Sequence, residues 1–336
     1  MSKILVTGAC GYIGSHTLVD LIENDFEVVS IDDNSRSSEE VLDSIKEITG
    51  VSVKNYQVNL CDFEKTKTVF QEHPDIEGII HFAAYKTVPE SVDKPLLYYR
   101  NNLNSLINLL ELSEEFQTPY FIFSSSCSVY GDVTDLPVTE NTSLVRTASP
   151  YGNTKKVGEE IIEDFSKNAF TKSIALRYFN PIGAHPSGKI GETPFLPPQN
   201  LMPIITENAI GKRDKILVFG NDYPTRDGSC IRDYIHVSDI AHAHTLAFKY
   251  LKNNTEAKKY DVLNIGSGEG VTVLEMLEAF EKATGQKLNY EIAPRRQGDT
   301  VAIYANNDKL VKALGWSAKF NLNDMMETSW NWEKTR

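Results

Sequence analysis

The sequence predicts an α/β fold, in which a doubly wound parallel sheet is followed by a smaller, loop-rich C-terminal domain. A glycine-rich turn comes directly after the β-branched run Lys3–Thr7. Strand-like runs then alternate with helical patterns through the first half of the chain, which is typical of a parallel sheet covered on both faces. After Phe179 the alternation stops, and residues 180–230 are rich in Pro, Gly and Asn. We therefore expect a first domain over residues 1–179 and a second over residues 180–336.

The first elements form a βαβ unit. The strand Lys3–Thr7 leads into the turn Gly8-Ala-Cys-Gly11-Tyr-Ile-Gly14, which is followed by a helical pattern through Leu18 and Leu21. A second buried strand, Glu27–Asp32, ends in carboxylates. Glycines let a backbone approach a pyrophosphate closely, and the N-terminus of the next helix offers free N–H donors to it. The unit therefore predicts a Rossmann-like dinucleotide site.

The later elements continue the alternation. We expect further strands at Val51–Val58, Gly78–Ala83, Pro119–Ser124 and Ser173–Phe179, and helices near Glu64–Glu72, Pro95–Phe116 and Pro150–Lys167. The charged run Glu39–Glu47 is typical of a solvated helix face. Regular patterns return at Tyr234–Tyr250 and Val262–Ile265, so the segment near residues 234–265 is expected to rejoin the first domain. In such a sheet, ligands bind at the carboxyl ends of the strands.

Composition limits the possible partners. The 336 residues, 41% of them hydrophobic, are enough for a full core in two lobes. The formal net charge of −12 argues against a nucleic-acid partner, because such binding depends on cationic neutralisation of phosphates. We expect no signal peptide, since the first strand begins at residue 3, and no membrane association. Four scattered cysteines without a CxxC pair favour thiols in a reducing cytoplasm over disulfides or a metal site.

The acid at the end of the second strand indicates which dinucleotide is bound. Asp32 follows Gly14 at the distance at which a carboxylate meets the adenosine ribose hydroxyls. A carboxylate there repels a 2′-phosphate and favours NAD over NADP. Arg36 lies nearby in the sequence, and its positive charge leaves the preference between NAD and NADP open.

A tyrosine and a lysine lie one helical turn apart in Tyr151-Gly-Asn-Thr-Lys155. Ser149-Pro150 predicts an N-cap followed by proline at the first helical position, which places Tyr151 in the first turn. The helix dipole and a nearby lysine both favour a phenolate, and we expect them to lower the pKa of Tyr151 from about 10. Ser126 closes the strand before this helix, and with the tyrosine–lysine pair it forms a candidate proton-transfer site.

The serine, tyrosine, lysine and glycine turn together resemble the extended short-chain dehydrogenase/reductase superfamily. A narrower resemblance covers almost the whole chain, and its motifs are Thr7–His16, His81–Lys86, Ser124–Gly131, Ser149–Lys155, Arg177–Gly188, Phe219–Gly228, Arg232–His236 and Ala293–Asp299. Through these motifs the chain is similar to the UDP-glucose 4-epimerases, also called UDP-galactose 4-epimerases.

The resemblance implies reversible 4-epimerisation of UDP-glucose and UDP-galactose, in galactose metabolism, with a tightly bound NAD regenerated in each turnover. It implies that Tyr151 is the base at the sugar 4-hydroxyl, that Lys155 binds the nicotinamide ribose, and that Ser126 hydrogen-bonds the 4-oxygen. The implied NAD-binding positions are Gly8, Gly11, Tyr12, Ile13, Gly14, Asp32, Asn34, Asn59, Leu60, Phe82, Ala83, Ala84, Lys86, Asn101, Ser126, Tyr151, Lys155 and Phe179. The implied UDP-sugar positions are Lys86, Ser126, Tyr151, Asn180, Asn200, Leu201, Leu217, Phe219, Arg232, Arg296, Asp299 and Ile303. A homodimer through the two long helices near Pro95–Phe116 and Pro150–Lys167 is implied as well.

Two positions depart from the family pattern. Asn59 stands where an aspartate is common near the adenine. Ile303 occupies the position whose size decides whether an N-acetyl group fits, and isoleucine is intermediate between an excluding tyrosine and a permissive small residue. The resemblance therefore leaves open an epimerase that also accepts UDP-N-acetylhexosamines.

Other functions are weighed against this one. A nucleotide-sugar 4,6-dehydratase needs an Asp-Glu pair where this chain has Cys127 and Ser128. A UDP-glucuronate 4-epimerase needs an additional cation for the sugar carboxylate, which the sequence does not clearly provide. An NAD-binding regulator without catalysis would be expected to lack the tyrosine or the lysine. We expect no metal, because His242 and His244 are spaced to point apart on a helix.

Overall fold

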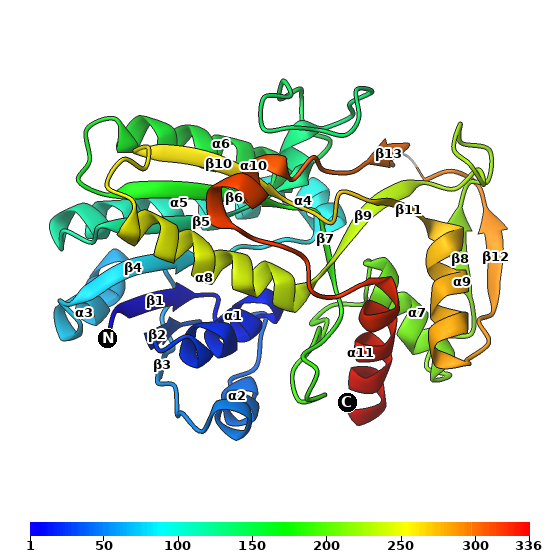
Figure 1. Ribbon diagram of the computed structural model, residues 1–336, viewed down its shortest axis with the longest axis horizontal. Helices are drawn as coiled ribbons and strands as arrows, with labels where there is room; N and C mark the ends of the chain where they lie inside the picture. The colour runs from blue at the N-terminus through cyan, green and yellow to red at the C-terminus, as the bar shows by residue number, and fades with distance from the viewer. Residues whose placement is uncertain (297) are drawn as a thin grey trace.

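The computed structural model of the protein describes residues 1–296 and 298–336, so Gln297 of the Ala293–Asp299 motif lies outside the described residues. The chain forms a large lobe around a parallel sheet and a smaller lobe beside one end of that sheet (Figure 1). The α/β fold with a doubly wound parallel sheet, predicted from the sequence, is confirmed.

Seven parallel strands make the sheet within the described residues, in the order β10-β6-β5-β4-β1-β2-β3. The strands are β1 (Lys3–Thr7), β2 (Glu27–Ile31), β3 (Asn55–Tyr56), β4 (Ile76–His81), β5 (Tyr120–Ser126), β6 (Lys172–Tyr178) and β10 (Tyr260–Ile265). The chain winds from β1 outward to β3 and then from β4 outward to β6 on the other side. The winding direction therefore reverses between β1 and β4, the place where open α/β sheets bind ligands.

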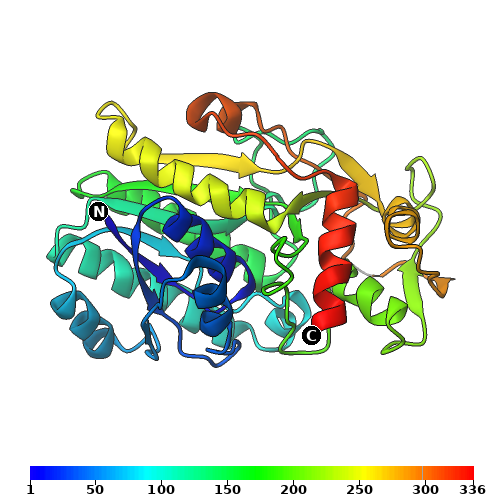
Figure 2. The same ribbon diagram turned by 60° about the horizontal axis from the view of Figure 1, so that its bottom comes forward.

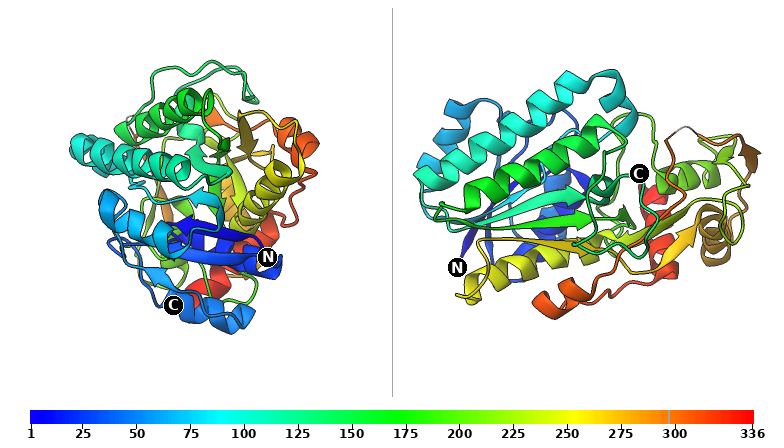
Figure 3. Two further views of the ribbon diagram at one scale, coloured as in Figure 1. Left: turned by 90° about the vertical axis from the view of Figure 1, so that its left-hand side faces the viewer. Right: turned by 90° about the horizontal axis from the view of Figure 1, so that it is seen from above.

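Helices cover both faces of this sheet. They are α1 (Tyr12–Glu23), α2 (Val41–Thr49), α3 (Phe63–Glu72), α4 (Val88–Asp93), α5 (Pro95–Glu115), α6 (Pro150–Ser166), α8 (Val237–Asn253) and α10 (Asp308–Leu314), with the 3₁₀ helix η1 at Cys127–Tyr130. Helices α1 and α8 lie side by side on one face, and α5 and α6 lie side by side on the other (Figures 2 and 3).

Strand β1 shows why both faces are covered. Ile4 and Val6 lie fully buried in the cluster that includes α1 and α8, whereas Leu5 lies in the cluster that includes α5 and α6. Successive side chains of a strand point to opposite faces, so an unbroken apolar run needs helices on both sides. Complete burial of each such side chain contributes roughly 1.5–3 kcal/mol.

The smaller lobe is built around a second set of strands. Its elements are β7 (Asn180–Ile182), β8 (Ile216–Phe219), β9 (Ile231–His236), β11 (Gly270–Thr272), β12 (Tyr290–Ala293), β13 (Ala302–Ile303), α7 (Leu201–Ala209), α9 (Val273–Thr284) and α11 (Leu322–Thr335). Strand β9 pairs with β7, β11 and β13, and β8 pairs with β12. Met202, Val218, Phe280 and Met326 are among the buried residues that join α7, β8, α9 and α11 into one core.

One predicted strand is longer than the strand in the structure. The strand expected at Val51–Val58 is reduced to Asn55–Tyr56, because among the described residues this edge strand pairs only with Ser30 and Ile31 at the end of β2. The charged run at residues 39–47 contributes to α2, where Asp43, Lys46 and Glu47 are exposed and Leu42 and Ile45 are buried, so the predicted solvated helix face is confirmed. The expected return near residues 234–265 covers α8, which packs on α1, and β10, which pairs with β6.

Candidate functional site

The turn between β1 and α1 has room only for glycine at two positions. Gly8 has a φ of +66°, and a Cβ built there would lie 2.7 Å from the Ala83 nitrogen. A Cβ on Gly14 would lie 2.3 Å from the Gly8 oxygen. None of the described side chains caps the N-terminus of α1, whose N-cap is Gly11. The turn therefore presents bare backbone and uncapped N–H groups at a helix N-terminus, which fits the pyrophosphate of a dinucleotide.

Asp32 lies immediately beside this turn. Its carboxylate accepts hydrogen bonds from the backbone N–H of Cys10 at 3.0 Å, from the N–H of Asn34 at 3.0 Å and from the Ser37 hydroxyl at 2.7 Å. Burial raises the pKa of Asp32, and these three donors lower it. The carboxylate thus links the glycine turn to the loop after β2, where the ribose of a dinucleotide would lie.

Arg36, which left the choice between NAD and NADP open, is engaged elsewhere. Its guanidinium donates two hydrogen bonds to the Glu90 carboxylate, at 2.9 and 3.0 Å. A 2′-phosphate would therefore have to compete with the Glu90 carboxylate for this guanidinium. The local charge beside Asp32 is therefore unfavourable to NADP.

Other residues predicted for the cofactor lie at the ends of neighbouring strands. Phe82, Ala83 and Ala84 follow β4, and the Phe82 N–H donates to the Thr7 oxygen at 3.0 Å, which holds this segment against the glycine turn. Asn59 and Leu60 follow β3, and Phe179 follows β6. Asn101 lies on α5, where its side-chain amide bonds the side chain of Asn102.

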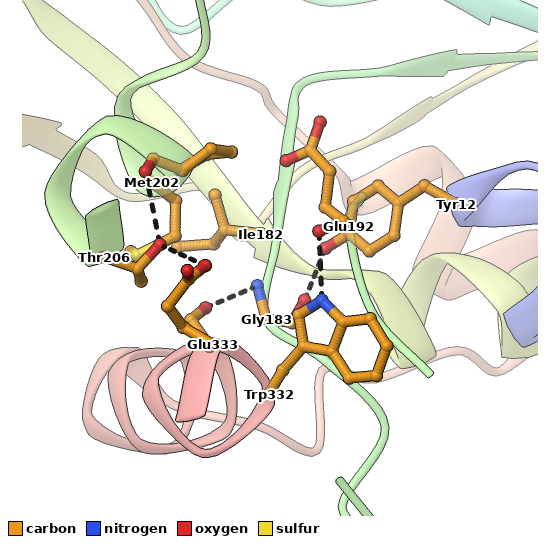
Figure 4. Close-up of a pocket in the computed structure, with 10 residues that line it drawn as sticks. Tyr12, Ile182, Gly183, Glu192, Met202, Thr206, Trp332 and Glu333 are labelled. Carbon is orange, nitrogen blue, oxygen red and sulfur yellow. Dashed lines mark hydrogen bonds between the residues drawn. The ribbon is translucent and has the colours of Figure 1, made fainter. Parts of the chain in front are cut away.

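The side chain of Tyr12 does not remain at the turn. Its hydroxyl donates to the Gly183 oxygen at 2.6 Å, across the boundary between the lobes. There it lies in a small pocket with Trp332 and Glu192 (Figure 4). At this position the backbone, rather than the phenol, is available to a dinucleotide.

Ser126, Tyr151 and Lys155 come from adjacent elements at the carboxyl edge of the sheet. Ser126 ends β5, and its hydroxyl accepts from the N–H of Ser128 at 3.2 Å, capping η1. Tyr151 lies in the first turn of α6, whose N-cap Ser149 accepts from the N–H of Gly152 at 3.2 Å. Lys155 is only 4% exposed, and its ammonium nitrogen lies 2.5 Å from the Ser124 oxygen.

The protonation of this pair differs from the expectation. Burial raises the pKa of Tyr151 to about 12, although a hydrogen bond with Ser126 opposes the rise. Burial also lowers the pKa of Lys155 to about 7. The prediction that lysine and dipole lower the tyrosine pKa is therefore wrong for the protein alone. In both cases burial is the largest cause of the pKa shift, because it disfavours the charged form of the group.

A buried polar network links α6 to β5 and β6, and it was not predicted from the sequence. Arg177 on β6 forms two hydrogen bonds to Glu159 on α6, at 2.9 and 2.6 Å. Glu159 also accepts from the Ser125 hydroxyl at 2.5 Å, and Arg177 donates to the Tyr130 hydroxyl at 2.9 Å. Tyr130 donates in turn to Asn264 on β10. An arginine inside an apolar strand run was the available signal, because a buried charge needs a partner.

The predicted UDP-sugar residues of the smaller lobe gather along the segment before β13. The Arg296 guanidinium lies 5.3 Å from the centroid of the Phe219 ring and 2.7 Å from the Asp299 carboxylate. Arg232 on β9 donates to the Thr300 oxygen at 2.7 Å. Ile303 pairs with Arg232 in the sheet and is buried. Two arginines therefore lie along one segment, an arrangement suited to a diphosphate.

The remaining predicted residues are more dispersed. Leu217 shares a face of β8 with Phe219 and is exposed, whereas Asn180 begins β7. Asn200 and Leu201 lie at the start of α7. Glu192, which the sequence analysis did not single out, accepts from the Asn200 amide at 3.0 Å and lies 3.5 Å from the Lys86 ammonium. The largely buried Glu192 side chain thus joins predicted residues of both lobes.

The described residues include no cluster of His, Cys, Asp or Glu suited to a metal ion. None of the helices among them combines the length and the apolar character needed to cross a membrane.

Comparison with known proteins identifies close relatives. A model of the GDP-mannose 4,6 dehydratase family matches residues 5–329. The chain is 47% identical to a UDP-glucose 4-epimerase of Bacillus subtilis, over 99% of this chain and 97% of that protein. It is 43% identical to the UDP-glucose 4-epimerase of Mus musculus, over 99% and 97% of the two chains. The crystal structure of a Bifidobacterium longum UDP-glucose 4-epimerase in complex with NAD⁺ and UDP superposes with a TM-score of 0.94 at 40% identity, covering 99% of this chain and 98% of that one.

Proposed function

Because the chain belongs to the UDP-glucose 4-epimerase family of the extended short-chain dehydrogenase/reductases, we propose that it interconverts UDP-glucose and UDP-galactose through a 4-keto intermediate. It is an NAD-dependent isomerase. The observation that carries the proposal is the convergence of Ser126, Tyr151 and Lys155 with the glycine turn at one edge of the sheet.

We assign the proton transfer to Tyr151 and Ser126. When bound, NAD supplies reversible two-electron oxidation at sugar C4. In its phenolate form, Tyr151 would take the proton of the 4-hydroxyl and return it, and Ser126 would hydrogen-bond the same oxygen. Lys155 lies one helical turn behind Tyr151, and because burial lowers its pKa to about 7, its proton moves readily near neutral pH.

The smaller lobe holds the nucleotide in this proposal. Inversion at C4 requires the keto sugar to present both faces in turn while the UDP stays anchored. Arg232 and Arg296 would clamp the diphosphate, and Phe219 lies beside Arg296. Binding energy at the diphosphate is independent of the sugar's orientation, so it anchors both epimers equally.

The dehydratase alternative lacks its acid–base pair in this chain. Cys127 and Ser128 follow Ser126 in η1, and burial raises the pKa of the Cys127 thiol to about 12. A neutral thiol and a serine hydroxyl do not replace two carboxyl groups in an elimination. The matching family model therefore describes the shared scaffold rather than the reaction.

The substrate range depends on the surroundings of Ile303. This side chain is buried in a cluster with Tyr130 and Phe179, among other residues. A packed isoleucine leaves little free space beside it, so we propose that unmodified UDP-hexoses are preferred. An epimerase that also accepts UDP-N-acetylhexosamines is the second candidate, because isoleucine is smaller than the excluding tyrosine.

The test is to incubate the purified protein separately with UDP-galactose, UDP-N-acetylgalactosamine and UDP-glucuronate and to identify the products by chromatography. We expect UDP-glucose from the first and little or no conversion of the other two. Absorbance at 340 nm should show no net NADH in solution. Stoichiometric NADH would instead indicate a dehydrogenase, and a 4-keto-6-deoxy product a dehydratase.

A homodimer is proposed as the working form, in the cytoplasm. Leu96, Leu103 and Ile107 lie on one face of α5, and Leu96 and Ile107 are exposed. Apolar residues at such spacing form a stripe suited to packing against another helix. The four free cysteines support a reducing compartment.

A further inference from the structure

Arg36 and Glu90 form an ion pair between two loops that are distant in sequence. The guanidinium nitrogens of Arg36 lie 2.9 and 3.0 Å from the two Glu90 oxygens, a bidentate arrangement. The side chains are 30% and 14% exposed. Arg36 follows β2, and Glu90 lies on α4, after β4.

The sheet order determines what this ion pair spans. Strand β1 lies between β2 and β4, and the glycine turn begins where β1 ends. A bond between the loop after β2 and the helix after β4 therefore crosses the carboxyl end of β1. The ion pair lies across the edge at which the glycine turn and Asp32 would hold the cofactor.

The Glu90 side of the ion pair is held firmly. The Tyr98 hydroxyl donates to the Glu90 carboxylate at 2.9 Å and accepts from the N–H of Thr87 at 3.1 Å. Arg36 and Tyr98 together lower the pKa of Glu90 to about 2, so the carboxylate stays charged through the physiological range. The acceptor is thus preorganised on α4.

The Arg36 side is anchored to the ribose-binding loop. Ser37, its neighbour, donates to Asp32, and the Arg36 guanidinium stacks 4.5 Å above the Tyr85 ring. A single exposed ion pair usually contributes little to stability. The Arg36–Glu90 pair differs because it is bidentate and partly buried, and because Tyr98 also bonds the carboxylate. Movement of the loop away from α4 breaks the pair and the stacking contact together.

From this geometry we propose that the Arg36–Glu90 ion pair is a latch that retains the bound cofactor, and that it must open for the dinucleotide to enter or leave. The inference rests on the proposed function, because an epimerase keeps one NAD through many turnovers. Arg36 is a positioning residue here, since it acts through the loop and not on the sugar.

The experiment measures release of NAD from the loaded protein. Free NAD is trapped by alcohol dehydrogenase with ethanol, and its appearance is followed at 340 nm. We expect Arg36→Met and Glu90→Gln each to speed release about 10-fold, the factor that corresponds to ~1.4 kcal/mol. The charge-exchanged double variant, Arg36→Glu with Glu90→Arg, should release NAD more slowly than either single variant.

Lys94→Met is the matched control. Lys94 lies 3.4 Å from the same carboxylate, but both residues belong to one segment after β4, so this pair does not cross the turn. We expect parental release from this variant. Release at the parental rate from Arg36→Met and Glu90→Gln, or equal acceleration by Lys94→Met, would overturn the latch. A parent protein that holds NAD but does not epimerise UDP-galactose would refute the proposed function instead, since the release assay is independent of the sugar.

Discussion

At the residue scale, burial determines the protonation of Tyr151 and Lys155. Tyr151 and Lys155 have pKa values of about 12 and about 7, so both favour the neutral form more than they would in solution. The buried amine nitrogen is placed by the backbone oxygen of Ser124. A sequence reveals that a tyrosine and a lysine are one turn apart, but the sign of their pKa shifts depends on the atoms around them.

Replacing the proposed base tests its role directly. We expect Tyr151→Phe to lower kcat by about 10²–10⁴-fold or more, the usual contribution of a positioned acid–base group. The amount of NAD bound to the purified variant should be unchanged, because the phenylalanine keeps the ring. Measurement of both quantities separates lost chemistry from lost cofactor, and near-parental kcat would remove Tyr151 from the base role.

At the element scale, the start of α6 determines where Tyr151 lies. Ser149 caps the helix, Pro150 occupies its first turn, and Tyr151 follows directly. A Cβ on Gly152 would lie 3.1 Å from the Ser128 oxygen, so α6 packs closely against η1. The cap and this close packing together hold the tyrosine beside Ser126.

Removing the cap should therefore affect both stability and turnover. Ser149→Ala is expected to cost about 1 kcal/mol of unfolding free energy and to lower kcat more than it changes KM. Asn321→Ala removes the corresponding cap of α11, where the side chain accepts from the N–H of Asp324, and should cost a similar free energy with parental kcat. Urea unfolding and steady-state kinetics measure both effects. Equal kcat values for the two variants would show that the cap does not position Tyr151.

The exposed stripe on α5 gives a second prediction at this scale. Leu96 and Ile107 are 76% and 38% exposed, so aspartate at both positions should leave the fold intact and prevent helix pairing. We expect Leu96→Asp with Ile107→Asp to sediment as a monomer. Val311→Asp, at an exposed position of α10, is the control and should sediment like the parent. An unchanged dimer in the double variant would place the interface elsewhere.

At the scale of the whole molecule, the two lobes share buried histidines at their junction. His16 on α1 and His236 at the end of β9 both have pKa values lowered to about 3, mainly by burial. His236 stacks on Phe320 with ring centroids 3.9 Å apart. Neutral imidazoles are therefore part of the packing between the lobes.

These histidines predict a loss of stability in mild acid. His16 has a pKa of about 3 in the folded protein and about 6.5 in the unfolded chain. As the pH falls from about 6.5 towards 3, the unfolded chain therefore binds a proton that the folded protein does not, and the folded state loses stability. Buried carboxylates with raised pKa values, such as Asp32, act in the opposite direction. The contribution of His16 is therefore measured by comparing how the unfolding free energy changes with pH in the parent and in a variant without this histidine. Between pH 7.5 and 5, the parent should lose about 2 kcal/mol more unfolding free energy than His16→Gln, measured with urea. If the unfolding free energies of the parent and of His16→Gln changed equally with pH, His16 would not be a neutral, buried imidazole.

Much of the larger lobe could be predicted because its signals are local. The glycine turn, the apolar strand runs and the Ser149 cap depend on residues adjacent in the chain. The smaller lobe was predicted mainly as loops, because its strands are short and pair across long separations, as β13 does with β9. The strand Val51–Val58 was predicted too long because pairing, rather than propensity, decides where an edge strand ends.

The sequence by itself determined the fold class and indicated the groups to which we assign the proton transfer, since periodicity, glycine and the Tyr-x-x-x-Lys spacing are properties of neighbouring residues. Only the tertiary structure decided that Tyr12 turns to the other lobe, that Arg36 is bound to Glu90, and that burial reverses the expected pKa shift of Tyr151. The physical reason is the same in each case. Desolvation and side-chain pairing depend on atoms brought together from distant parts of the chain, and no local pattern records which atoms those are.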